Sequence, residues 1–180
     1  MSPSLTAFFD ALDRWTRQVP LPDLMRRLEH LHVELDELGP FVQFDPVRYR
    51  RNLLHAAPAY QALVLCWRAA QRSPIHDHRG SSCGVRVLRG VATETLFART
   101  SAGLIYATRS RELPAGSVCG SLDMDIHQVS NLQADGCDLI TLNVYSPPLL
   151  HMGVYSLTDA TRHEYEDPIH AGVVLDGSGI

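Results

Sequence analysis

The segment "SPIHDHRGSSCGVRVLRG", residues 73–90, concentrates residue types that can bind a metal or carry redox chemistry. His76 and His78 are separated by one residue, and Cys83 follows five positions after His78. On a strand, residues i and i+2 project from the same face, so both imidazoles would point one way and Asp77 the other. Two imidazoles on one strand are the beginning of a metal site, and a pair of surface or hydrogen-bonded histidines is the alternative.

The same spacing occurs at His30 and His32, within a stretch of helical periodicity. Residues i and i+2 of a helix do not face each other, so this pair is not expected to chelate a metal. Further downstream, Pro-x-Gly at 114–116 precedes His127, and Asn131 follows.

The elements that must position these residues change in character once along the chain. Apolar residues recur at helical spacing from Leu5 to Leu38 and are interrupted by "VPLPD" at 19–23, which predicts two amphipathic helices within residues 4–40. Short apolar runs punctuated by Gly, Pro and Asp follow over 41–165 and predict an antiparallel sandwich or barrel. Residues 166–180 are expected to be a tail with a disordered end, and the 180 residues to form a single domain.

Composition excludes several functions. The chain is 45% hydrophobic and 20% charged with a net charge of −4, which gives no reason to expect a nucleic-acid partner. All sixteen basic residues are Arg, so Schiff-base chemistry, pyridoxal phosphate attachment and a P-loop are excluded for want of a lysine. No apolar run approaches the roughly 20 residues of a membrane span, and charges from Asp10 onward interrupt any signal peptide. A cytoplasmic protein without a membrane partner is expected.

The four cysteines show no Cys-x-x-Cys spacing, which disfavours both a disulfide framework and a structural zinc site. Cys66, Cys119 and Cys137 are expected to be buried small apolar residues. Cys83 needs separate treatment because of its position after the two histidines.

The motifs resemble those of the cupin superfamily, small antiparallel β-barrels with His-x-His in a first motif and Pro-x-Gly, His and Asn in a second. Two features depart from the usual pattern: Cys83 replaces an acidic ligand, and the gap from Pro-x-Gly to His127 is long. Both are typical of the cysteine dioxygenase family. Over about residues 45–160 the chain resembles that family through "YRRN" at 49–52, "LCW" at 65–67, "IHDH" with Cys83, "IHQVSN" at 126–131 and "YSPP" at 145–148.

This resemblance implies a mainly β protein, a cupin-type jelly-roll barrel preceded by an N-terminal helical segment. It implies that His76, His78 and His127 bind Fe(II), and that Arg51 holds a substrate carboxylate. It also implies that Cys83 and Tyr145 lie beside the iron and can form a thioether cross-link. Tyr49, with Trp67 and Met152, is expected to line the substrate pocket.

These roles have ordinary alternatives. Arg51 belongs to a basic cluster with Arg48 and Arg50 that solvent could surround, and strands commonly contain tyrosines such as Tyr145. The chemistry is nevertheless consistent: three neutral imidazoles leave the metal its full positive charge, which a substrate thiolate can offset. A guanidinium can make a two-pronged contact with a carboxylate.

One departure bears on mechanism. The family usually has a serine and a histidine on the strand that leads to the tyrosine, and here Thr141 and Asn143 occupy those places. Thr141 retains a hydroxyl, but Asn143 cannot take up a proton near neutral pH. The leading hypothesis is oxidation of L-cysteine by O2 to cysteine sulfinate. A 3-mercaptopropionate dioxygenase, or one acting on another small thiol carboxylate, and a non-catalytic metal- or ligand-binding cupin are the alternatives.

Overall fold

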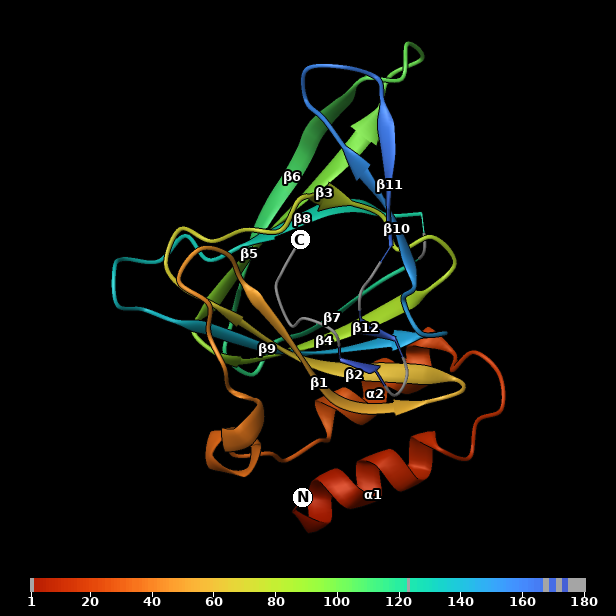
Figure 1. Cartoon of the computed structure of the whole chain (residues 1–180), viewed down its shortest axis with the longest axis vertical. Coiled ribbons are helices and arrows are strands. Elements are labelled where there is room, and N and C mark those ends of the chain that lie inside the picture. The colour runs from red at the N-terminus through yellow and green to blue at the C-terminus, as the bar shows by residue number, and fades with distance from the viewer. Residues whose placement is uncertain (1, 123, 167–168, 171–172, 175–180) are drawn as a thin grey trace.

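The protein is described here by a computed structural model, which covers residues 2–122, 124–166, 169–170 and 173–174. The chain begins with three short helical elements that precede the sheets (Figure 1). They are α1 (Pro3–Leu12), α2 (Leu21–Glu29) and the 3₁₀ helix η1 (Leu35–Phe41). The predicted helical segment is therefore present, but it is divided differently from the sequence pattern.

The second helix begins and ends earlier than predicted. It starts at Leu21, inside the predicted break. Proline is tolerated in the first turn of a helix, because a backbone N–H at that position would have no hydrogen-bond partner within the helix. It ends at Glu29, and the ring of His30 bonds the carbonyl oxygen of Arg26 at 2.7 Å. His30 and His32 consequently lie outside any helix, and both are exposed.

The strands form two large antiparallel sheets. The five-stranded sheet has the order β1-β2-β9-β4-β7, with β1 (Arg50–Ala57), β2 (Tyr60–Trp67), β4 (Ser82–Arg89), β7 (Val118–Ser121) and β9 (Leu139–Ser146). The six-stranded sheet has the order β11-β10-β3-β8-β5-β6, with β3 (Ile75–His76), β5 (Val91–Arg99), β6 (Ile105–Pro114), β8 (Ile126–Ser130), β10 (His151–Tyr155) and β11 (Arg162–Glu166). The short strands β12 (Ile169–His170) and β13 (Val173–Val174) pair only with each other.

The adjacent strands β2 and β9 of the five-stranded sheet are buried along their whole length. On β2, Val64 and Cys66 belong to the core beneath the helices, whereas Leu65 and Trp67 belong to the core between the sheets. This follows from the two-residue period of a strand, and it explains why β2 is a continuous apolar run without polar alternation. Figure 1 shows the helices on the outer side of this sheet and the six-stranded sheet on its other side.

Two glycines allow α2 to lie close against the sheet. Gly84 on β4 pairs with Gly120 on β7, and both lie beneath the helix. A Cβ at Gly84 would come within 2.7 Å of the Leu28 side chain, and one at Gly120 within 2.6 Å of the Met25 sulfur. A larger residue at either position would force the facing Leu and Met side chains of α2 to shift.

The prediction of a mainly β protein with N-terminal helices is confirmed. The barrel is not closed, because no ladder among the described strands joins the five-stranded sheet to the six-stranded one. Residues 175–180, where the disordered end of the tail was expected, lie outside the described residues. None of the described helices combines the length and apolar character needed to cross a bilayer.

Candidate metal centre

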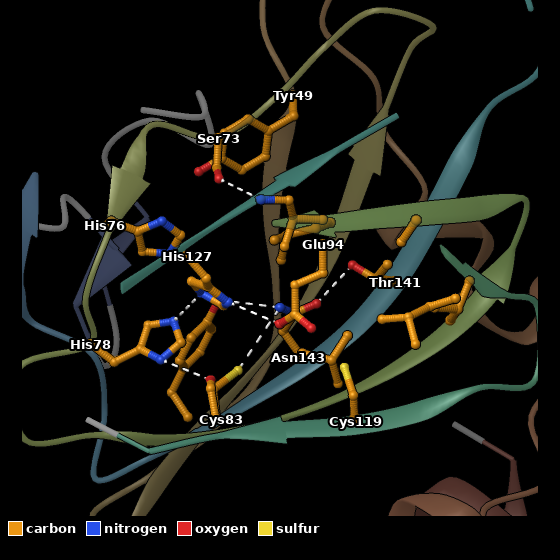
Figure 2. A pocket seen from close by; sticks show the side chains of 18 of the residues that line it. Tyr49, Ser73, His76, His78, Cys83, Glu94, Cys119, His127, Thr141 and Asn143 are labelled. Carbon is orange, nitrogen blue, oxygen red and sulfur yellow. Dashed lines mark hydrogen bonds and ion pairs between the residues drawn. The ribbon is translucent and has the colours of Figure 1, made fainter. Parts of the chain in front are cut away.

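All nine sequence-predicted site residues line one cavity between the two sheets (Figure 2). The cavity is small, with about 30 Å³ open to the centres of water-sized molecules. Its walls include Tyr49, Arg51, His76, His78, Cys83, His127, Thr141, Asn143 and Tyr145. Trp67 and Met152, which were expected to line the pocket, do so as well. The fold therefore brings together residues that are nearly 100 positions apart in the chain.

Three imidazoles converge at one end of this cavity. His76, His78 and His127 are each at most 6% exposed, and their rings have centroids 4.8–5.2 Å apart. One nitrogen from each ring can be chosen so that all three nitrogens lie within 4.8 Å of one another. Such a convergent set of neutral nitrogen donors fits a divalent transition-metal ion.

Strand pairing positions His76 and His127. The third histidine, His78, lies in a turn that is held by the buried carboxylate of Asp77. His76 on β3 pairs directly with His127 on β8. His78 lies beyond the end of β3, which is only two residues long, so the predicted strand through both histidines is wrong. The predicted directions are nevertheless found, because Asp77 points away from the rings and accepts a hydrogen bond from the backbone N–H of Gly153 at 2.9 Å.

On the side away from the histidine rings, the Asp77 carboxylate accepts hydrogen bonds from three residues. The hydroxyl of Tyr155 and the guanidinium of Arg162 both donate to its carboxylate, in addition to the N–H of Gly153. A buried carboxylate that is paired and hydrogen-bonded holds its backbone firmly. The turn between His76 and His78 is thereby tied to β10.

Each histidine uses its Nδ1 to bond a different group. The Nδ1–H of His76 donates to the carbonyl oxygen of Pro74 at 3.0 Å, since a carbonyl can only accept. The Nδ1 of His78 bonds the Ser121 hydroxyl at 3.2 Å, and the Nδ1–H of His127 donates to Glu94 at 3.0 Å. The Nε2 atoms of His78 and His127 lie 3.3 Å apart. Nε2 of His127 has a free lone pair, and Nε2 of His78 has one when its Nδ1–H donates to Ser121. This is the arrangement that metal-binding histidines require.

Burial favours the uncharged form of His76 and His78. Burial, followed by the charge that His127 would carry, lowers the pKa of His76 to about 3. The same causes lower the pKa of His78 well below its usual range. A neutral imidazole is the metal-binding form, so His76 and His78 need not lose protons at neutral pH to accept an ion.

Arg51 and Tyr49 also belong to the cavity wall. Arg51 is 2% exposed, which contradicts the solvated-cluster alternative, whereas its neighbour Arg48 is exposed. Its guanidinium carbon lies 5.9 Å from the ring centroid of Tyr145. Tyr49 stacks on Trp67 with ring centroids 4.0 Å apart. The cavity wall thus contains a buried guanidinium in addition to the three histidines.

A hydrogen-bonded series along β9 leads to the Tyr145 hydroxyl. Thr141 Oγ1 donates to the Asn143 side-chain oxygen at 2.7 Å, and the Asn143 amide donates to the Tyr145 hydroxyl at 3.2 Å. Cys83 on β4 is the direct cross-strand partner of Tyr145. Burial raises the pKa of the Cys83 thiol and that of the Tyr145 hydroxyl, so both groups keep their protons.

Sequence reasoning missed two cavity residues that contact the histidines. Glu94 and Ser121 are the partners of His127 and His78, and neither belongs to a recognisable motif. The only signal for Glu94 is a lone acidic residue within the apolar strand at 91–99. The prediction for Cys137 is also wrong, because Cys137 is exposed. Cys66 and Cys119 are buried as expected, although Cys119 lines the cavity.

Comparison with solved structures identifies the architecture. A Klebsiella pneumoniae protein, described as an uncharacterized conserved protein with a double-stranded beta-helix domain, matches with a TM-score of 0.54 and 16% sequence identity. The match covers 70% of this chain and 92% of that one. The chain therefore has the double-stranded β-helix fold, a cupin-type architecture, and the buried histidine cluster gives it a candidate metal site.

Sequence comparison identifies the family within that class. The family model described as cysteine dioxygenase type I matches residues 18–158. Human cysteine dioxygenase type 1 is 28% identical over 137 residues, which span 73% of this chain and 67% of the human protein. The bovine enzyme is 31% identical over 118 residues, 62% of this chain and 58% of that protein. The chain belongs to the cysteine dioxygenase type I family, and the expected enzyme class, a thiol dioxygenase, is confirmed.

Proposed function

We propose that this protein is an Fe(II) enzyme that converts L-cysteine and O2 into cysteine sulfinate. The observation that carries the proposal is the placement of the histidine cluster and of Arg51 around one tyrosine. The His78 ring lies 5.4 Å from the Tyr145 ring, and the Arg51 guanidinium carbon lies 5.9 Å from the same ring. A molecule with a thiol at one end and a carboxylate at the other, and no longer than a small amino acid, suits this arrangement.

His76, His78 and His127 would hold the metal through Nε2. When bound there, Fe(II) would favour the thiolate form of the substrate and supply the redox chemistry for its reaction with O2. Both oxygen atoms enter the product, R–SH + O2 → R–SO2H, so atoms and electrons balance without an external reductant. The protein must therefore hold the thiol and carboxylate in place and control the proton.

Arg51 would hold the substrate, and Tyr145 would control the proton. The buried guanidinium of Arg51 can bind the carboxylate through two charge-assisted hydrogen bonds, which orient the substrate with its sulfur toward the histidines. The Tyr145 oxygen accepts a hydrogen bond from Asn143, which orients the hydroxyl so that its proton can be donated to a polar atom of the bound substrate. Because Asn143 donates here, this arrangement requires no titratable residue at position 143.

A panel of thiols tests the proposal. The Fe(II)-loaded protein is given L-cysteine, 3-mercaptopropionate or cysteamine while O2 uptake and sulfinate are measured together. We expect one O2 per sulfinate and a kcat/KM for L-cysteine about tenfold or more above that for either analogue. A preference for 3-mercaptopropionate would replace the proposed substrate. Absence of O2 uptake with every thiol, despite bound iron, would refute the dioxygenase.

We further propose that Cys83 and Tyr145 become joined by a thioether bond. They are direct partners on neighbouring antiparallel strands, so their side chains lie on the same face of the sheet. The Asn143 amide lies 3.2 Å from the Tyr145 oxygen and 4.0 Å from the Cys83 sulfur, so it bridges the pair. The bond forms by loss of the thiol hydrogen and one ring hydrogen. The two electrons and two protons pass to O2, which becomes H2O2.

The cross-link predicts an intact mass about two units below the sequence value after turnover with substrate and O2. A disulfide gives the same mass change, so the protein is reduced strongly and digested before peptide analysis. We expect a Cys83–Tyr145 peptide that survives reduction. It should be absent from Cys83→Ser and present in Cys119→Ser, which removes the other cavity thiol. Full recovery of both unmodified peptides from an active preparation would rule the bond out.

A further inference from the structure

We propose that Glu94 is a positioning residue of the metal centre, whose carboxylate makes His127 the strongest electron donor of the three histidines. This inference rests on the proposed metal site and adds to it a group outside the ligand set. Glu94 lies on β5 and is 4% exposed. It lines the cavity and faces the histidine cluster in Figure 2.

The two oxygens of Glu94 have separate partners. Oε1 accepts the Nδ1–H of His127 at 3.0 Å. Oε2 pairs with the guanidinium of Arg111, which donates from Nε at 2.7 Å and from a terminal nitrogen at 2.5 Å. Strand β6 supplies Arg111 directly opposite Glu94 in the β5–β6 ladder. The carboxylate is therefore held in one orientation, with one oxygen committed to the histidine.

The partners of the three histidines differ in charge. His76 donates to a backbone carbonyl, and His78 bonds a serine hydroxyl, both of which are neutral. His127 alone among the three donates to a carboxylate. A carboxylate that accepts the Nδ1–H increases the electron density of the imidazole and strengthens the bond that its other nitrogen makes to a metal. The three ligands should therefore be unequal.

The negative charge of Glu94 also compensates for the lack of negative charge in the ligand set. Three neutral imidazoles bring no negative charge to a divalent ion. Glu94 places one negative charge a single hydrogen bond from the cluster, inside the cavity wall. The Arg111 side chain is 36% exposed, so water screens its positive charge more effectively than that of the buried carboxylate. The negative charge should therefore prevail at His127.

A purely structural role for the pair makes a different prediction. Glu94 and Arg111 could simply fasten β5 to β6, in which case removing either partner would disturb the metal site equally. If Glu94 acts through His127, loss of Arg111 should matter much less, because the Glu94–His127 hydrogen bond remains. The two roles are thus separable by comparing substitutions of the two partners.

The test measures Co(II) affinity by chelator competition and the visible Co(II) spectrum, with no substrate present. We expect Glu94→Gln to weaken Co(II) binding about 10- to 100-fold and to shift the spectrum. Arg111→Gln should weaken binding by less than about fivefold, because it removes a partly exposed partner. Glu112→Gln, which changes an exposed carboxylate on the same hairpin, should have no effect.

A double variant removes the risk that Arg111 is left unpaired and destabilises the fold. Glu94→Gln/Arg111→Met should lose as much affinity as Glu94→Gln and keep its thermal unfolding transition. Unchanged affinity in both Glu94 variants would overturn the inference, as would equal losses in Glu94→Gln and Arg111→Gln. If the unaltered protein binds no Co(II), the metal centre itself is refuted and the inference falls with it.

Discussion

Replacement of His127 by alanine is expected to lower metal affinity by more than about 100-fold and to abolish O2 consumption with any thiol. Loss of a group that only supports a ligand typically costs 10- to 100-fold in metal affinity, so loss of the ligand itself must cost more. The site has three converging nitrogens and, among the described residues, no further His, Cys, Asp or Glu grouped with them as a replacement. Metal content after iron loading and O2 uptake are the measurements.

The matched control is His151→Ala, which removes an exposed histidine from β10. It should retain full metal content and activity. His127→Ala also leaves Glu94 without one partner, so its folding must be checked by thermal unfolding in the metal-free state. A folded His127→Ala protein with normal iron content and activity would show that His127 is not a ligand.

Replacement of Arg51 by alanine is expected to lower kcat/KM for L-cysteine by about 100-fold, mainly through KM, with metal content unchanged. The two-pronged contact with the carboxylate should be worth about 3 kcal/mol, which corresponds to that factor. Activity on cysteamine, which has no carboxylate, should change little because the lost contact is to the carboxylate alone. Steady-state kinetics on the two thiols provides the comparison.

Arg50→Ala is the control for this experiment. Arg50 is adjacent in sequence, but it bonds the Asn52 side chain and is absent from the cavity wall. It should leave both activities close to those of the unaltered protein. Equal losses of activity on cysteine and cysteamine in Arg51→Ala would instead mean that Arg51 acts through stability, and the nature of the substrate would have to be reconsidered.

Local patterns predicted much of the fold and of the candidate site. The strands at 60–67 and 139–146 are recognisable because several consecutive apolar residues end at turn-forming residues. The helix boundaries were less accurate, because prolines at 20 and 22 both break and begin helices. The strand through His78 was wrong because tertiary bonds to Asp77, not strand pairing, hold that part of the chain.

Short motifs in the sequence determined the family, the three histidines and the pairing of a cysteine with a tyrosine, because these depend on residue type and spacing. Tertiary structure decided that Arg51, the arginine to which the motif pointed, is buried and not solvated, since a one-residue change of register on β1 exchanges the two faces. It also decided the role of Glu94. A register shift between Leu96 and Phe97 in the β5–β6 ladder sets which residue faces Arg111, and the β5–β8 ladder brings Glu94 to His127. The contacts of Glu94 with Arg111 and His127 depend on the register of both ladders, and no local sequence pattern specifies these registers.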